Sequence, residues 1–203
     1  MRCSRRHGDN TRSMTARLIL VCHASTDAVR RAAFPTDEPI DEPGRAQAAR
    51  LADRLPRAER HRSSPELRAR QTAEAMRLDA APLALLRECN YGTWAGRGFD
   101  AVLADSPDTV AQWLSDPMAT PHGGESVSSL LQRVVAWLSD EISLDCRSIV
   151  VTHATIIRAA IVHALETPPQ SFWRVDIAPL SVTRLTGAGG RWNLASSGCV
   201  ARL

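Results

Sequence analysis

Two histidines in this sequence stand directly after short runs of apolar residues. His23 ends the stretch "LILVCH", and His153 ends the stretch "IVVTH". Such runs are typical of strands that are buried on both faces of a sheet. Ligands of an open α/β sheet bind beyond the carboxyl ends of its parallel strands, so we expect both imidazoles to lie in one crevice. His7, in "RRHGDNT", follows no strand pattern and is not expected to belong to a site.

An arginine and a glutamate complete the candidate site. Arg68, in "SSPELRARQTAE", is expected in the first turn of a helix, where the guanidinium and the helix dipole together would hold an anion. Glu88, in "LRECNYGTWAGR", is expected in a loop whose burial would raise its carboxyl pKa enough for general-acid catalysis. Two histidines, an arginine and a carboxyl group suit phosphoryl transfer. Taken singly, each histidine fits a polar strand end equally well.

The elements that would position these residues alternate between strand and helix. Strands are expected at 17–22, within 57–64 and at 148–153, and a closing hairpin at 180–186 and 191–196. Helices are expected at 44–55, 66–78, 124–142 and 154–165, the second of them with Ser64 as its cap and Pro65 in its first turn. This alternation indicates a doubly wound α/β sheet.

Composition narrows the class of protein. A chain of 203 residues with 44% hydrophobic content suits one domain, expected at 17–203 after a polar, arginine-rich and disordered extension at 1–16. The net charge of +3, from 25 basic and 22 acidic residues, is too balanced for nucleic-acid binding. Five scattered cysteines predict neither disulfides nor a zinc site. No apolar run approaches the roughly 20 residues of a membrane span, so a cytoplasmic location without a membrane partner is expected.

An ordered series of motifs resembles the histidine phosphatase superfamily, in its phosphoglycerate-mutase-like branch. The motifs are "CHAST", "GRAQAARLADRL", "SSPELRARQTAE", "LRECNYGTWAGR", "PHGGES" and "VVTHATIIR", and they cover about residues 17–186. The resemblance implies a three-layer α/β/α sandwich with a mostly parallel sheet. It also implies a small phosphorylated substrate and catalysis through a phosphohistidine, with no metal and no cofactor.

The resemblance assigns a role to each candidate residue. His23 aligns with the nucleophile that takes the phosphoryl group. Arg68 and His153 align with the residues that hold the phosphoryl oxygens. Glu88 aligns with the acid that protonates the leaving oxygen and then draws a proton from the attacking water. Thr26 matches a phosphate-binding hydroxyl position of the first motif.

The motif "PHGGES" supplies two further matches, Glu125 and Ser126. A helix start with an acidic first turn would show the same pattern. Both interpretations of this motif stay open at the level of sequence.

The first motif departs from the family pattern. The family normally has Arg-His-Gly, and this chain has Cys22-His23-Ala24; Val29 stands where asparagine is common, and Ala154 where glycine is usual. Loss of a two-pronged arginine contact would cost roughly 3–5 kcal/mol. Candidate replacements for this cation are Arg30, Arg31 and Arg45.

Three functions are compatible with these residues. The first is an active phosphomonoesterase, preferred over a mutase because "PHGGES" and the short segment between Glu88 and it resemble the compact phosphatases of the family rather than its mutases, which have long insertions. The second is an inactive member that binds a phosphorylated ligand or partner, and the third is a phosphatase with an altered substrate, such as an α-ribazole-phosphate-like nucleotide or a diester of lower charge. Cys22 is not expected to be a nucleophile of the tyrosine-phosphatase kind, because Ala28 stands where those enzymes carry their arginine.

Overall fold

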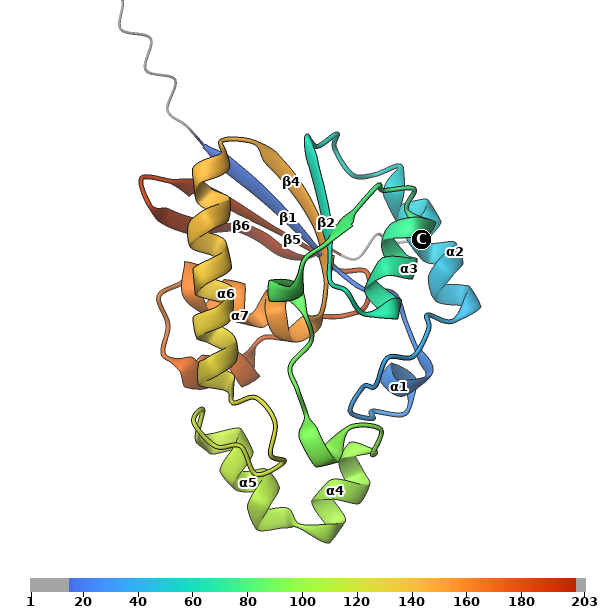
Figure 1. The fold of residues 1–203 in the computed structure, drawn as a ribbon, viewed down its shortest axis with the longest axis vertical. Coiled ribbons are helices and arrows are strands. Elements are labelled where there is room, and N and C mark those ends of the chain that lie inside the picture. Colours follow the sequence, from blue (N-terminus) through green and yellow to red (C-terminus); the bar gives the residue numbers. More distant parts are fainter. Residues whose placement is uncertain (1–14, 200–203) are drawn as a thin grey trace, which may run out of the picture.

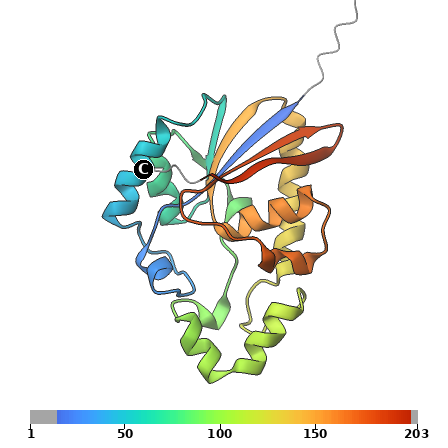
Figure 2. The same ribbon diagram turned by 180° about the vertical axis from the view of Figure 1, so that it is seen from behind.

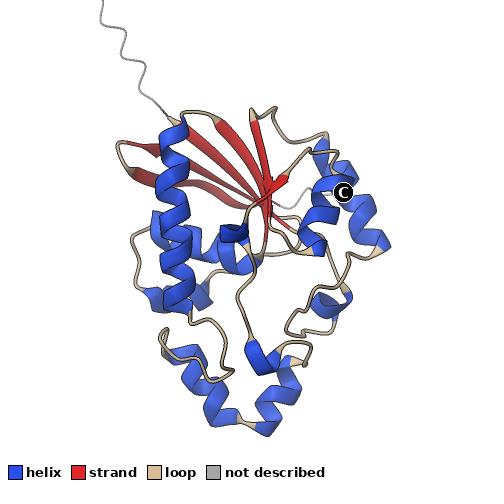
Figure 3. Cartoon of the chain, in the orientation of Figure 1, coloured by secondary structure: helices blue, strands red, loops and turns tan. Residues whose placement is uncertain are grey.

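A six-stranded sheet forms the centre of the computed structural model, which describes residues 15–199 (Figures 1 and 3). Its strands are β1 (Ala16–Cys22), β2 (Arg60–Ser63), β3 (Ala81–Pro82), β4 (Arg147–Thr152), β5 (Val182–Ala188) and β6 (Arg191–Cys199). Their spatial order is β3-β2-β4-β1-β5-β6. The first four in that order are parallel, β5 is antiparallel to β1, and β6 is antiparallel to β5. The predicted mostly parallel α/β fold is therefore confirmed.

Helices cover both faces of the sheet, which gives three layers (Figures 1 and 2). On one face lie α2 (Glu42–Ala52) and α3 (Leu67–Ala75), and on the other lie α6 (Val127–Glu141) and α7 (Ala154–Ala164). Strand β1 shows why its sequence is apolar throughout. Leu18 and Leu20 pack into the cluster that includes α6 and α7, whereas Ile19 and Val21 pack into the cluster that includes α2 and α3.

A smaller helical part lies beyond the carboxyl ends of the strands, at the bottom of Figure 1. It contains α4 (Phe99–Asp105) and α5 (Pro107–Ser115), with α1 (Asp27–Arg30) beside it. An aromatic core that includes Phe34, Trp94 and Trp113 holds this part together. Short 3-10 helices complete the described chain at η1 (Ala84–Leu86), η2 (Gly92–Trp94), η3 (Ile142–Leu144) and η4 (Pro169–Arg174).

Several boundaries differ from those expected, and two of these differences change the assignment of a named residue. Ala16, which we assigned to the extension, is the first residue of β1 and is buried. The predicted cap of α3 was wrong, because the helix begins at Leu67 with Glu66 as its N-cap residue. The hydroxyl of Ser64 is instead drawn to Glu66 and His153. Residues 1–14 of the expected extension, including His7, lie outside the described residues, and the single-domain assignment stays a prediction.

The lengths and sequences of the described helices decide whether any of them could cross a lipid bilayer. Within residues 15–199, none is both long enough and apolar enough to cross a membrane.

Candidate active site

The two histidines lie side by side at the carboxyl edge of the sheet. Strands β1 and β4 are parallel neighbours in which Cys22 pairs with Thr152, so His23 and His153 leave the sheet at the same level. Their ring centroids are 5.3 Å apart in an edge-to-face arrangement. His23 is 6% exposed and His153 is fully buried. The structure thus brings together the two imidazoles that the strand patterns predicted to meet.

The ring of His23 is held in one protonation state. Its Nδ1 lies 2.8 Å from the carbonyl oxygen of Ala24, and because a carbonyl only accepts, Nδ1 carries the proton. Burial lowers the pKa of His23 to about 3, and the charges of His153 and Arg68 act in the same direction. At neutral pH the ring is therefore uncharged, with an unprotonated Nε2. That is the state in which an imidazole can act as a nucleophile.

Arg68 and Glu88 form a buried ion pair beside the histidines. Arg68 is fully buried; one terminal nitrogen donates to the carbonyl oxygen of Thr36 at 2.7 Å, and the other lies 3.3 Å from Oε2 of Glu88. The Nε–H of Arg68 has no partner within the described chain. The same Oε2 of Glu88 lies 3.3 Å from Nδ1 of His153. All four predicted residues therefore meet in one place.

The pKa of Glu88 moves opposite to the sequence-based expectation. Burial raises the pKa of this carboxyl, but the charges of His153 and Arg68 and hydrogen bonds from the Thr155 hydroxyl and the Cys89 N–H lower it by more. The net pKa is lowered, so Glu88 is ionised in the unliganded site. The prediction that burial would dominate was wrong, because the loop places this carboxyl beside His153 and the guanidinium of Arg68.

The spacing of these groups also bears on metal binding. Ligand atoms of His23, Glu88 and His153 all lie within 4.8 Å of one another, and they form a candidate metal group among residues 15–199. The guanidinium of Arg68, 3.3 Å from the Glu88 carboxylate, places a fixed positive charge at the same point. Like charges repel, so the arrangement favours an anion over a cation.

The substituted first motif is closely packed. Cys22 is 2% exposed and Ala24 is fully buried, with the Ala24 N–H donating to Oγ1 of Thr72 at 2.9 Å. Burial raises the pKa of the Cys22 thiol to about 12; Glu88 adds to the rise, and Arg158 and Arg68 oppose it. The thiol is therefore neutral at physiological pH and is not poised as a nucleophile.

The arginines that we considered as replacements for the missing cation have other partners. Arg30 pairs with Asp41 at 2.6 Å, Arg31 pairs with Asp27 at 2.7 Å, and Arg45 lies 4.0 Å from Glu42. Besides Arg68, a second arginine acts on the pKa of the Cys22 thiol through its charge. This residue is Arg158, in α7.

Arg158 is held in place by the backbone. Its Nε donates to the carbonyl oxygen of Val175 at 2.7 Å. The motif "VVTHATIIR" contains this arginine, although its pattern assigned it no role.

Thr26 and Val29 lie at the start of the loop that follows β1. The Thr26 hydroxyl caps α1 by accepting from the Val29 N–H at 3.2 Å, and it donates to Oε1 of Glu38 at 3.2 Å. The side chain of Val29 is 43% exposed, in contrast to the other departures from the family pattern: Cys22 and Ala24 are buried and Ala154 is half-buried. A phosphate contact by Thr26 stays a prediction.

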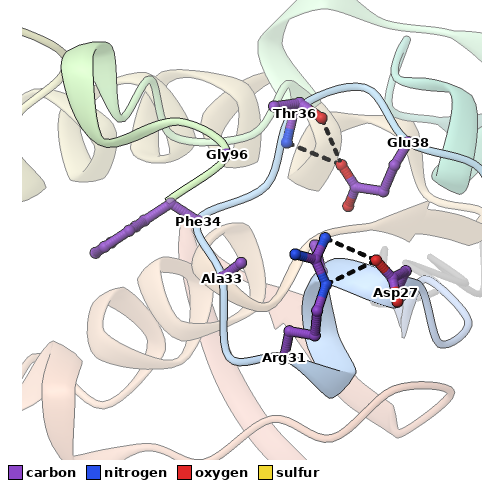
Figure 4. Close-up of a pocket in the computed structure, with 8 residues that line it drawn as sticks. Asp27, Arg31, Ala33, Phe34, Thr36, Glu38 and Gly96 are labelled. Carbon is purple, nitrogen blue, oxygen red and sulfur yellow. Dashed lines mark hydrogen bonds and ion pairs between the residues drawn. The ribbon is translucent and has the colours of Figure 1, made fainter. Parts of the chain in front are cut away.

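A small cavity adjoins this loop (Figure 4). It has a volume of about 60 Å³ and is lined by Asp27, Ala28, Arg31, Ala33, Phe34, Thr36, Glu38 and Gly96. Its charged groups are already paired, Arg31 with Asp27 and Glu38 with the N–H and hydroxyl of Thr36 (Figure 4). Thr36 belongs both to the lining of this cavity and to the surroundings of the site, because its carbonyl oxygen accepts from Arg68.

Glu125 and Ser126 serve the start of α6. The Ser126 hydroxyl accepts from the Ser129 N–H at 3.0 Å, which makes Ser126 the N-cap. Glu125 forms a two-pronged ion pair with Arg133, at 2.9 and 2.7 Å. Of the two interpretations of "PHGGES", the structure supports the helix start, but the expected acidic first turn was wrong, because Glu125 precedes the cap and α6 has no acidic residue in its first turn.

Sequence reasoning missed a group of polar residues behind His153. Oε2 of Glu66 lies 3.1 Å from Nε2 of His153, and Oε1 accepts from the Glu88 N–H at 3.2 Å. The Ser64 hydroxyl lies 2.7 Å from the same Nε2 and donates to Glu66. Burial raises the pKa of Glu66, but hydrogen bonds from His153 and Ser64 overcome this effect and bring it to about 2. The one available signal was an acidic residue two positions before Arg68.

Comparisons with known proteins agree with this geometry. The Histidine phosphatase superfamily (branch 1) matches residues 18–199. The Bifunctional protein Rv2228c of Mycobacterium tuberculosis is 30% identical over 192 residues, which cover 88% of this chain and 52% of that protein. The chain therefore spans about half the length of the curated relatives it matches.

Solved structures share the fold. A mycobacterial glucosyl-3-phosphoglycerate phosphatase, Rv2419c, solved with VO3, superposes with a TM-score of 0.78 at 27% identity, covering 88% of this chain and 96% of that chain. A mutant phosphoserine phosphatase from Entamoeba histolytica in complex with phosphoserine has a TM-score of 0.83 at 22% identity, covering 92% and 98%. At that identity the second likeness concerns the fold alone.

The match to the family covers almost all of the described chain. Together with the neighbouring phosphatases, it supports a phosphatase enzyme. The chain belongs to branch 1 of the histidine phosphatase superfamily.

Proposed function

We propose that this chain is a phosphomonoesterase that hydrolyses a small phosphorylated metabolite through a phosphohistidine intermediate on His23. The observation that carries the proposal is the state of the His23 ring. Its Nδ1 proton is held by Ala24, and its neutral, unprotonated Nε2 stands in a cluster with Arg68, His153 and Glu88. A buried nucleophile beside a guanidinium is the arrangement that attack on a phosphate ester requires.

In the first step, Nε2 of His23 attacks the phosphorus atom and the bond from phosphorus to the leaving oxygen breaks. Arg68 and His153 stabilise the charge on the phosphoryl oxygens. The leaving oxygen takes a proton from Glu88. Glu88 is ionised in the unliganded site, and the bound phosphate promotes its protonation. The negative charge of the phosphate draws Arg68 and His153 away from Glu88 and raises the proton affinity of that carboxyl.

In the second step, water attacks the phosphohistidine and Glu88 accepts a proton from that water. The bond between phosphorus and Nε2 breaks, phosphate leaves, and His23 returns to its neutral state. The relative solved with VO3, an oxyanion of vanadium, supports an oxyanion-binding pocket in this fold. No step of the proposed reaction calls for a metal ion or a cofactor.

A second candidate is a member that binds a phosphorylated ligand or partner without turnover, and the observation that favours it is Cys22. No arginine stands at this position, and Arg30 and Arg31 pair with aspartates of the loop region instead. A pocket with one fewer cation also favours a substrate of lower charge, such as an α-ribazole-phosphate-like nucleotide.

The test is release of phosphate from p-nitrophenyl phosphate and from a panel of small phosphate esters. We expect turnover by the wild type and its loss, by about a thousandfold or more, in His23→Ala. Mass spectrometry at mildly alkaline pH should detect a phosphoryl group on His23 in the wild type. Unchanged turnover in His23→Ala would refute the mechanism, and tight binding of a phosphate ester without turnover would favour the second candidate.

A further inference from the structure

Both ring nitrogens of His153 face a carboxylate. Nε2 lies 3.1 Å from Oε2 of Glu66, and Nδ1 lies 3.3 Å from Oε2 of Glu88. The His153 side chain is fully buried, so water does not compete for either nitrogen. We propose that Glu66 is a positioning residue that holds His153 as a doubly protonated, positively charged imidazolium. Its catalytic consequence rests on the proposed function.

The hydroxyl of Ser64 fixes the first proton. It donates to Oε2 of Glu66, so a lone pair of its oxygen is free to accept from Nε2 of His153 at 2.7 Å. Nε2 therefore carries a proton that points at Ser64 and Glu66. A neutral imidazole has only one N–H group. In that neutral state an unprotonated Nδ1 would lie 3.3 Å from a carboxylate oxygen of Glu88 with no proton between them, which is repulsive.

A second proton removes this repulsion. With Nδ1 protonated, the 3.3 Å contact with Glu88 becomes an ion pair, and Nδ1 has no hydrogen-bond partner among the described residues. Glu66 also accepts from the backbone N–H of Glu88 through its other oxygen, at 3.2 Å. One carboxylate thus holds His153 and the loop that carries Glu88 in a fixed relation.

The balance of charge in the site points the same way. The charged and titratable groups that contact His153 in the described chain are Glu66, Glu88 and His23; Arg68 pairs with the same Glu88, and His23 is neutral at physiological pH. With a neutral His153, one guanidinium would face two carboxylates, and the buried site would repel an anion. With a charged His153, two cations balance two carboxylates.

This charge matters more here because Cys22 stands where the family pattern has an arginine. When a phosphate ester binds, Nδ1–H of His153 can leave its ion pair with Glu88 and donate to a phosphoryl oxygen, while Nε2–H stays on Glu66 and Ser64. The histidine then supplies a charged donor that the first motif lacks. The same movement frees Glu88 for proton transfer.

The test compares Glu66→Gln with Glu74→Gln, an exposed residue of the same helix α3. Nitrogen-15 NMR of labelled histidine rings, with His153 assigned by its loss in His153→Asn, reports the protons on each nitrogen without any turnover. We expect two ring protons on His153 near neutral pH in the wild type and in Glu74→Gln, and one in Glu66→Gln. Glu66→Asp, which keeps the carboxylate, should restore the second proton and serves as the test if Glu66→Gln does not fold.

A second measurement is the affinity for inorganic phosphate, by calorimetry at acidic and alkaline pH. In Glu66→Gln we expect His153 to be charged at acidic pH and neutral at alkaline pH, whereas in the wild type it stays charged at both. The ratio of the Glu66→Gln Kd to the wild-type Kd should therefore be close to one near pH 5.5. It should reach about tenfold or more near pH 8, which corresponds to about 1.4 kcal/mol. The proposal is overturned if His153 keeps both protons in Glu66→Gln, or if the ratio is the same at both pH values.

These readouts separate the two proposals. If the wild type hydrolyses no phosphate ester but loses the second His153 proton in Glu66→Gln, the proposed function fails and the role of Glu66 stands. If hydrolysis proceeds through His23 but the His153 protons do not respond to Glu66→Gln, the proposed function stands and the role of Glu66 fails.

Discussion

Acidification should destabilise this protein through one buried side chain, that of His23. Burial lowers the pKa of this imidazole from 6.5 to about 3, and the charges of His153 and Arg68 add to the shift. The folded chain therefore keeps the ring neutral, whereas the unfolded chain takes up a proton near the ordinary pKa. The stability that this histidine contributes is present above about pH 6.5 and is lost as the pH falls towards 3.

Linkage gives the size of the effect. With these two pKa values, protonation of the unfolded state lowers the free energy of unfolding by roughly 0.1 kcal/mol at about pH 7.5 and by about 1.4 kcal/mol near pH 5.5. The expected loss between the two conditions is the difference, about 1.3 kcal/mol. For a chain of this length, that loss corresponds to a fall of roughly 3–5 °C in Tm.

The assay is urea-induced unfolding of the wild type and of His23→Asn at both pH values. The change in unfolding free energy between the two pH values is compared across the two proteins, so that contributions from all other titrating groups cancel. His163→Asn, which removes a half-buried histidine from the last turn of α7, is the matched control and should keep the wild-type loss. If His23→Asn loses as much stability on acidification as the wild type does, His23 is not the buried neutral ring described above.

Two further predictions concern residues near the site. Cys22→Ser should leave kcat within about a factor of three of the wild-type value, because a thiol whose pKa is raised to about 12 is neutral at assay pH. A fall of a hundredfold or more in phosphate release would show that Cys22 takes part in the chemistry. Arg133→Met should lower the free energy of unfolding by about 3 kcal/mol, measured by urea denaturation, because it leaves the largely buried Glu125 without its partner. The same variant should keep kcat/KM within a few-fold, and a selective loss of activity in a stably folded Arg133→Met would contradict the structural role of this pair.

The sheet and the main site residues were predictable from local patterns. The apolar run of β1 reads as a doubly buried strand because alternate residues of it face two different clusters. His23 and His153 stand at strand ends, so the rule for parallel sheets was enough to bring them together. The order of motifs then identified Arg68 and Glu88 as their neighbours, and the structure agrees.

The electrostatic state of the site depends on contacts that local patterns do not contain. Burial alone predicted a raised pKa for Glu88, and the outcome is opposite because His153 and Arg68 face it from other elements. Glu66 looked like an ordinary residue before a helix, yet it contacts His153, which is 87 positions away in the chain. Such pairings arise only when β4 and the start of α3 pack together.

The substituted first motif shows the same division. The sequence alone establishes that Cys22 stands where an arginine is normal, and so that one positive charge is missing from the expected pocket. Only the packed structure decides which groups surround that position, since Arg30 and Arg31 have turned to nearby aspartates and His153 lies between two carboxylates. Residue types and strand ends are local properties of a chain, whereas charge and proton affinity depend on every group within a few ångströms, and these come from distant segments.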